Sequence, residues 1–169
     1  MGKVDEIQIR EGEPRDFDWL ISAHARIYAA DFGFSDAFGE NIREKLAEFS
    51  AREDRTKRIW IAEANGQPVG SIAVSEKNPG EAFINFVLVE PSFREHGLAR
   101  RLLGLALDHA QGAGMKRVRL ETYSVLTKAR RLYASAGFVK ESVETGWEKF
   151  GAKFDREFWT MDLSEALAL

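Results

Sequence analysis

The stretch of sequence that decides the fold reads Val87-Leu88-Val89-Glu90-Pro91-Ser92-Phe93-Arg94-Glu95-His96-Gly97-Leu98-Ala99-Arg100-Arg101-Leu102-Leu103. It is preceded by apolar residues from position 82, a run too hydrophobic for a strand with one face in water. Pro91 ends this strand, and leucines at helical spacing follow from about Gly97 to Ala110. The stretch therefore predicts a central strand, a short loop and an amphipathic helix, as in a sheet covered by helices.

The loop and the helix start indicate a site for an anion. The first turn of a helix has unpaired backbone N–H groups and the positive end of the helix dipole. Gly97 and Ala99 have minimal side chains, so a phosphate group can approach the backbone, and Arg94 and Arg100 can add charge. Small residues at a helix start also allow close packing on a strand, so the pattern alone leaves both interpretations open. The spacing differs from that of a Rossmann dinucleotide site.

The hydrophobic period predicts the other elements on both sides of this stretch. We expect further strands at 4–10, 59–64, 69–75, 118–123, 138–145 and 154–163, and further helices from Pro14 to about Gly33, after Ser35 as N-cap, and at 127–136. Asn65-Gly66 lies between two of the strands and is a strong hairpin signal. The order predicts an α/β mixture in one domain spanning 1–169, with an antiparallel meander feeding one crossover.

Composition excludes several classes of protein. The chain has 169 residues, 44% of them hydrophobic and 30% charged, and a net charge of −3, with the two signs interleaved. The absence of a basic stripe argues against nucleic-acid binding. There is no cysteine for a thiolate metal site or a nucleophile, and His24, His96 and His109 have no metal-ligand spacing, so no metal is expected. With no signal-peptide core and no membrane-length apolar run, we expect a cytoplasmic protein that does not contact a membrane.

A second motif narrows the interpretation of the first. Ala129-Arg130-Arg131-Leu132-Tyr133-Ala134-Ser135-Ala136-Gly137-Phe138 follows the next predicted strand. The pattern Arg/Gln-x-x-Gly-x-Gly/Ala, then a strand, then Ala-x-x-Leu-Tyr-x-x-x-Gly-Phe resembles the two central motifs of the GNAT acetyltransferase superfamily. The resemblance covers nearly the whole chain. It implies a splayed mixed sheet of about seven strands with helices on both faces.

A closer likeness is to the acetyltransferase half of bacterial regulators that fuse a MarR-type DNA-binding domain to a GNAT domain. The similar segments are His24-Ala25-Arg26-Ile27-Tyr28, Ser124-Val125-Leu126-Thr127-Lys128-Ala129-Arg130, Phe150-Gly151 and Phe158-Trp159-Thr160-Met161-Asp162-Leu163. No winged-helix segment precedes the first expected strand, so the likeness implies a free-standing relative.

The resemblance implies acetyl-CoA as cosubstrate. The pantetheine arm is expected beside the strand end at Val87, Leu88 and Val89, where a backbone N–H would also polarise the thioester carbonyl. The diphosphate would bind backbone N–H groups from the loop and helix start, namely Arg94, Glu95, His96, Gly97, Leu98, Ala99 and Arg100. Two residues depart from the family pattern. Leu126 replaces a common Asn that contacts pantetheine, with Thr127 as a substitute, and Glu95 replaces a common Gly, so its carboxylate is expected to point away from the diphosphate.

The resemblance also implies one catalytic residue. Tyr133 matches the tyrosine that commonly protonates the departing thiolate, and its alternative role is that of a core aromatic. A phenol has a pKa of about 10 and a cysteine-type thiol about 8.5, so local electrostatics must assist the transfer. Glu81, Asn85 and Glu121 lie on central strands as candidates for the residue that deprotonates the acceptor, but alternation does not say which of them faces the cleft.

The implied function is transfer of an acetyl group from acetyl-CoA to a primary amine, by direct attack in a ternary complex. The alternative is a non-catalytic sensor or regulatory module that binds acyl-CoA. The acceptor side is expected between the first two helices and the C-terminal strands, where His24 lines the pocket or is packed. An aromatic wall of Phe32, Phe34, Trp147 and Trp159 is one possibility there, and core packing is the other. Homodimers are frequent in the family, although the sequence shows no interface.

Overall fold

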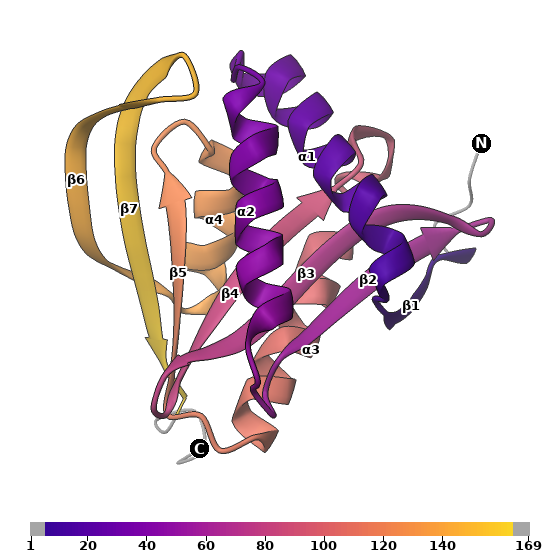
Figure 1. Ribbon diagram of the computed structural model, residues 1–169. Coiled ribbons are helices and arrows are strands. Elements are labelled where there is room, and N and C mark those ends of the chain that lie inside the picture. Colours follow the sequence, from indigo (N-terminus) through magenta and orange to yellow (C-terminus); the bar gives the residue numbers. More distant parts are fainter. Residues whose placement is uncertain (1–5, 164–169) are drawn as a thin grey trace.

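A computed structural model describes residues 6–163 and is shown in Figure 1. Its elements in chain order are β1 (Gln8–Glu11), the 3-10 turn η2 (Pro14–Asp16), α1 (Phe17–Phe32), α2 (Ala37–Ala51), β2 (Arg58–Ala64), β3 (Gln67–Asn78), β4 (Glu81–Val89), η3 (Pro91–Phe93), α3 (Leu98–Gly112), β5 (Arg117–Tyr123), α4 (Thr127–Ala136), β6 (Val139–Lys149) and β7 (Ala152–Asp162). The predicted order of strands and helices is confirmed.

The strands form one mixed sheet of seven, in the order β1-β2-β3-β4-β5-β7-β6. Neighbouring strands are antiparallel except for β4 and β5, which are parallel and are connected through α3. The predicted meander, with one crossover after the apolar strand, is therefore confirmed.

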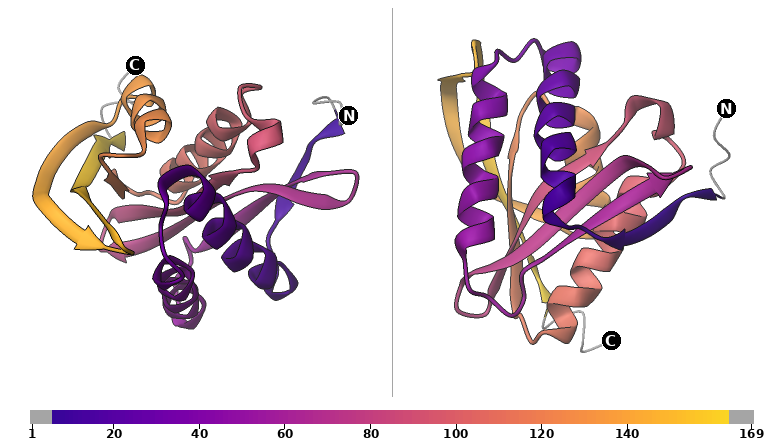
Figure 2. Two further views of the ribbon diagram at one scale, coloured as in Figure 1. Left: turned by 90° about the horizontal axis from the view of Figure 1, so that it is seen from above. Right: turned by 45° about the vertical axis from the view of Figure 1, so that its right-hand side comes forward.

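Helices cover both faces of the sheet, as predicted (Figure 2). On one face, α1 and α2 bury Leu20, Phe38, Ile42, Leu46 and Phe49 against Ile59, Ile61, Ala73 and Phe86. On the other face, α3 and α4 bury Leu98, Leu102, Ala106 and Tyr133 against Ile72, Val74, Val118 and Leu120. Leucines at helical spacing thus form one apolar side of α3, and burial of this side removes it from water.

The sheet splays in its centre. Pairing of β4 with β5 covers only Glu81 to Ile84 against Arg117 to Leu120, and the rest of β4 lies without a strand on that side. Just beyond Ile84, β4 has a bulge: Ser71 and Ala73 of β3 pair with Leu88 and Asn85. Phe86 takes the left-handed conformation there, with φ of 56°, which is costly for an aromatic residue.

The bulge has a specific hydrogen bond. The hydroxyl of buried Ser71 donates to the carbonyl oxygen of Phe86 over 2.6 Å. A buried carbonyl displaced from the ladder needs such a donor, because leaving it unpaired destabilises the fold. This hydrogen bond therefore supports the bulge just beyond the point where pairing with β5 ends.

Two boundary predictions need correction. Asp36, rather than Ser35, is the residue that precedes the first turn of α2. The backbone N–H of Ser35 instead donates to the carbonyl of Phe150, between β6 and β7, over 2.8 Å, so Ser35 belongs to a contact with that hairpin. The first strand begins at Gln8, and the part of its predicted range before residue 6 lies outside the described residues.

Candidate active site

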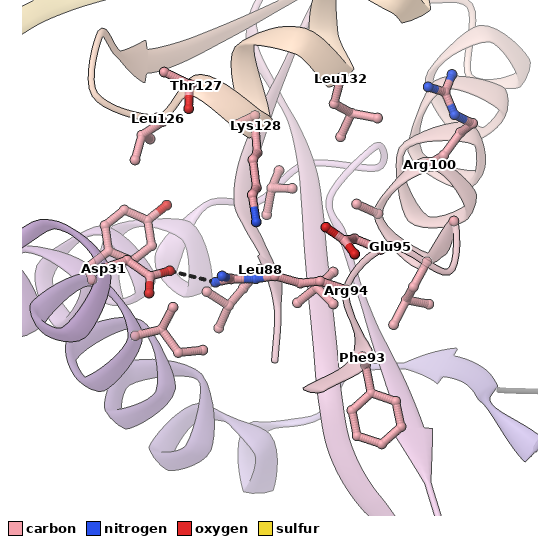
Figure 3. A pocket seen from close by; sticks show the side chains of 18 of the residues that line it. Asp31, Leu88, Phe93, Arg94, Glu95, Arg100, Leu126, Thr127, Lys128 and Leu132 are labelled. Carbon is pink, nitrogen blue, oxygen red and sulfur yellow. Dashed lines mark hydrogen bonds and ion pairs between the residues drawn. The ribbon is translucent and has the colours of Figure 1, made fainter. Parts of the chain in front are cut away.

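A cleft of about 670 Å³ opens where β4 leaves β5 (Figure 3). Its walls are α1, the end of β4, the loop and first turn of α3, and the first turn of α4. Ten residues predicted to contact the cofactor line it: Val87, Leu88, Val89, Arg94, Glu95, Gly97, Leu98, Ala99, Arg100 and Thr127. The structure thus brings together residues from three separate segments. His96 is exposed and does not line the cleft, and Tyr133 lines a neighbouring cavity.

The start of α3 presents unpaired backbone N–H groups to this cleft. Gly97 is the N-cap, with φ of 77°, a left-handed conformation that glycine adopts without strain. No side chain caps the helix, so the N–H groups of its first turn keep their hydrogen-bonding capacity. Glu95 also has a positive φ, of 67°, where glycine would be less strained.

Charged side chains surround this helix start. Arg94 forms an ion pair with Asp31 of α1 over 2.8 Å, and Figure 3 shows Lys128 pointing into the same space. Arg100 instead donates to the hydroxyl of Ser135 on α4 over 2.9 Å. Glu95 is exposed but lines the cleft, so the expectation that it points away from this space is not met.

A second cavity, of about 90 Å³, lies on the other side of the splay. The residues that line both cavities are Tyr28, Val87, Leu126 and Ala129. The second cavity reaches further toward α2 and β5, where it is lined by His24, Lys45, Asn85, Glu121, Tyr123 and Tyr133. The small cavity therefore lies next to the large cleft and shares four of its lining residues.

Tyr133 is a core aromatic residue that also lines the small cavity, and its catalytic role stays a prediction. It is 5% exposed, belongs to the core beneath α3 and α4, and packs on Phe138 with ring centres 5.9 Å apart. It also lines the small cavity. Burial raises the pKa of Tyr133 above its usual value, so the phenol keeps its proton at neutral pH.

His24 is likewise both packed and part of the small cavity. Its Nδ1 lies 2.7 Å from the carbonyl oxygen of Leu20, one turn earlier in α1. Burial lowers the pKa of His24 to about 4, so the ring is neutral at physiological pH. With Nδ1 donating to the carbonyl, Nε2 is left as an acceptor.

The three candidates for deprotonating an acceptor occupy different places. Asn85 and Glu121 line the small cavity, whereas Glu81 does not and forms an ion pair with Arg117 over 3.4 Å. Glu121 lies between two cations, with Lys45 at 3.5 Å and Arg156 at 3.1 Å. Among the residues described, Glu121 is therefore the carboxylate that lines this cavity.

The four aromatic residues considered for the acceptor side lie in different parts of the structure. Phe32 lines the large cleft, while Phe34 is buried in a cluster that includes Phe150 and Phe154. Trp147 packs against the same cluster. Trp159 lies on the opposite face of the sheet, where its indole N–H donates to Glu157 over 2.9 Å. A single aromatic wall built from all four residues is therefore wrong.

Other residues of the two cavities carried no sequence signal. Lys45 reaches the small cavity from α2, far along the chain from every motif, and Asp31 reaches the large cleft from α1. Lys128, which directly follows Thr127 in the first turn of α4, is the one that the motif could have indicated.

Within residues 6–163, no group of three or more His, Cys, Asp or Glu side chains is arranged to hold a metal ion. No helix in this part of the chain is long and apolar enough to span a membrane.

The class of protein follows from comparison of the chain with known families. The chain belongs to the Acetyltransferase (GNAT) family, whose profile matches residues 20–138, a range that includes both cavities and both motifs. The fold and the family membership predicted from the two motifs are thus confirmed.

Individual relatives agree on the family and differ in length. The chain is 37% identical to mycothiol acetyltransferase of Thermobifida fusca over 101 residues, which are 60% of this chain and 30% of that protein. It is 33% identical to the uncharacterized N-acetyltransferase YjgM of Escherichia coli over 123 residues, 70% of this chain and 74% of that protein. The chain thus spans well under half of the first of these relatives.

Solved structures share the fold. An N-acetyltransferase from Staphylococcus aureus Mu50 superposes with a TM-score of 0.77 at 19% identity, covering 93% of this chain and 98% of that one. The yncA protein of Salmonella typhimurium, solved with its cofactor acetyl-CoA, superposes with a TM-score of 0.74 at 23% identity, covering 94% of both chains.

Proposed function

We propose that this protein transfers an acetyl group from acetyl-CoA to a primary amine, by direct attack in a ternary complex. The observation that carries the proposal is the pair of cavities that meet at the splay and share the wall of Tyr28, Val87, Leu126 and Ala129. Because the same four residues line both cavities, reactants bound in the two cavities would lie close to each other. Family membership and the acetyl-CoA bound to yncA support the choice of cosubstrate.

Acetyl-CoA would occupy the large cleft. The free edge of β4 beyond Ile84 would bind the amide groups of the pantetheine arm, as a peptide binds a sheet edge. The uncapped N–H groups at the start of α3 would bind the diphosphate, aided by the positive charge of Lys128. This arrangement would bring the thioester to the wall that the two cavities share.

The acceptor amine would occupy the small cavity. An alkylamine has a pKa of about 10.4, so at neutral pH only about one molecule in a few thousand is neutral and nucleophilic. Glu121 would accept the proton that the amine must lose, and its ion pairs with Lys45 and Arg156 would hold its carboxylate in place. The amine nitrogen would then attack the thioester carbon, with a backbone N–H near Leu88 or Val89 stabilising the oxyanion.

Tyr133 would complete the reaction. As the carbon–sulfur bond breaks, the thiolate of CoA would take the phenol proton, which burial keeps on Tyr133 at neutral pH. The products would be the N-acetylated amine and CoA. No covalent enzyme intermediate is required, because the amine attacks the thioester directly.

A single domain, a cytoplasmic location, a homodimer and the likeness to MarR-linked domains stay predictions of the sequence.

Binding and turnover test this proposal separately. A ligand present at 100 times its Kd stabilises a protein by about 2.7 kcal/mol, which for a domain of this size raises Tm by roughly 5 to 10 °C. We expect such a rise with acetyl-CoA and none with NADH, followed by release of CoA thiol when a panel of amines is added. Acetyl-CoA binding without turnover of any amine would indicate the sensor function instead, and no rise in Tm with any acyl-CoA would contradict both.

Replacing Glu95 tests the diphosphate site. Removing a negative charge that lines the cleft should strengthen binding of the anionic cosubstrate, so we expect Glu95→Gln to lower the Kd for acetyl-CoA by about 2- to 5-fold. Glu95→Gly should do the same and also relieve the positive φ. Isothermal titration calorimetry measures the Kd. Glu53→Gln, in the exposed loop after α2, is the control that should leave it unchanged, and weaker binding by both Glu95 variants would contradict the placement of the diphosphate.

A further inference from the structure

Positive charge is concentrated beside the small cavity, although the whole chain has a net charge of −3. Four cationic side chains, which we call the basic cluster, come from α2, β3, β5 and β7: Lys45, Lys77, Arg119 and Arg156. Lys45 lines the cavity, and Arg156 contacts Glu121 in its wall. Burial lowers the pKa of Lys77 below its usual value; the negative charge of Glu121 opposes this shift, and the positive charges of Lys45, Arg52 and Arg119 add to it. Lys45, Lys77 and Arg119 are therefore close enough to interact electrostatically.

The two arginines of the basic cluster are held in fixed orientations. The guanidinium carbons of Arg119 and Arg156 lie 4.3 Å and 4.9 Å from the ring centre of Phe158, which is only partly exposed. Arg156 also lies 5.0 Å from the ring centre of Trp147. Contact with aromatic rings limits the motion of a guanidinium group but leaves the N–H donors at its edge available for an anion.

Neighbouring carboxylates do not cancel this charge. Glu121 is shared between Lys45 and Arg156, while Glu141 is shared between Arg119 and Arg117. Glu144 lies 3.8 Å from Arg156, and its side chain is 54% exposed. The Nε atoms of Arg119 and Arg156 are buried and lack a hydrogen-bond partner among the described residues, so these ion pairs are poorly aligned. A polyamine or a basic peptide would meet repulsion here, whereas an anion would be attracted.

We propose that the acceptor is a small amine that also carries a carboxylate or a phosphate, and that the basic cluster binds this anionic group while the amine reaches Glu121. The inference rests on the proposed function, because it assigns the substrate class of the same site. The cavity of about 90 Å³ has room for several groups of the size of water, which suits the amine end of a small molecule. The anionic group would bind at the rim, where planar guanidinium groups match the geometry of a carboxylate or a phosphate.

Matched pairs of acceptors test this class directly. The first series compares phenylalanine with phenylalaninamide and glycine with glycinamide, and the second compares O-phosphoethanolamine with ethanolamine. In at least one series, we expect the compound with the carboxylate or phosphate to have a kcat/KM about 10- to 100-fold higher than its partner without that group. Charge-assisted hydrogen bonds commonly give a difference of this size. The series with the larger ratio identifies the anionic group as carboxylate or phosphate. The ratio should fall as salt is added, because exposed charges are screened.

Substitutions identify the residues responsible. Arg156→Gln should reduce the preference for the anionic member to about 3-fold or less, and Arg156→Lys should retain part of it, since a charge remains but the planar fork is lost. Arg117→Gln is the matched control. It removes an arginine of β5 whose ion pairs are with Glu81 and Glu141 rather than with Glu121 of the cavity wall, so the preference should be unchanged. A preference that survives in Arg156→Gln and Arg119→Gln together would overturn the assignment.

A binding measurement separates failure of this inference from failure of the proposed function. Calorimetry on the CoA-saturated protein compares the Kd of N-acetylphenylalanine with that of its amide. If acetyl-CoA binds and no amine is turned over, the proposed function fails, while tighter binding of the N-acetyl acid would still support an anionic ligand. If the amide, or spermidine, binds or reacts as well as the anionic compound, the inference is wrong even where acetyl transfer is observed.

Discussion

Tyr133→Phe is expected to lower kcat by about 10²- to 10⁴-fold, the usual contribution of a positioned general acid. The variant loses only the hydroxyl that would protonate the thiolate of CoA and keeps the ring that packs on Phe138. The Kd for acetyl-CoA should therefore stay within about 3-fold, and the free energy of unfolding within about 1 kcal/mol. Because burial raises the pKa of this phenol, the wild type should lose no activity through its ionisation below about pH 10. Steady-state kinetics, calorimetry and thermal unfolding measure these quantities.

The same variant distinguishes catalysis from packing. If Tyr133 were only a core aromatic, Tyr133→Leu would lower Tm and both variants would keep kcat. A kcat unchanged in Tyr133→Phe would contradict its role as general acid. A protein with no turnover to lose would bind acetyl-CoA equally well with and without the hydroxyl, as expected for a sensor.

Glu121→Gln is expected to lower kcat/KM by about 10²- to 10⁴-fold at neutral pH. The amide has a similar shape but cannot accept a proton from the amine. The loss should shrink as the pH approaches the pKa of the acceptor, about 10 for an alkylamine, because the substrate then arrives already neutral. Recovery at high pH is the feature that a purely structural role would not produce.

A matched control accompanies this variant. Glu81→Gln also removes a carboxylate from a central strand and breaks an ion pair, with Arg117, but it lies outside both cavities. Its kcat/KM should remain within about 3-fold of the wild type. If the Glu121→Gln defect were equally large at every pH, Glu121 would serve to hold Lys45 and Arg156 rather than to accept a proton.

The fold was predictable because its signals are local and agree with one another. The apolar run of β4, the glycines after α1 and α4, and Asn65-Gly66 each specify one boundary or turn. The start of α2 was misplaced because Ser35 makes a backbone contact with Phe150, which is distant in sequence. The bulge at Phe86 was also not predictable, since nothing in the residue type favours a positive φ.

The candidate site was predictable only where it lies on the motifs. Loop residues such as Gly97 could be assigned to the large cleft because a helix start fixes the direction of its N–H groups. The small cavity draws on α1, α2, β4, β5 and α4 together, and no spacing in the sequence relates Lys45 to Glu121. Which strand residues face a cavity depends on the register of β4 and β5, and that register is a property of the folded sheet.

The short contact between β4 and β5 also bears on the mechanics of the molecule. The two halves of the sheet are joined only by the pairing of β4 with β5 from Glu81 to Ile84. Beyond Ile84 the two strands diverge. A small rotation about this junction would change the width of the cleft most at its far end, beside the loop that precedes α3. The stiffness of these few strand pairs would then limit how far the cleft can open.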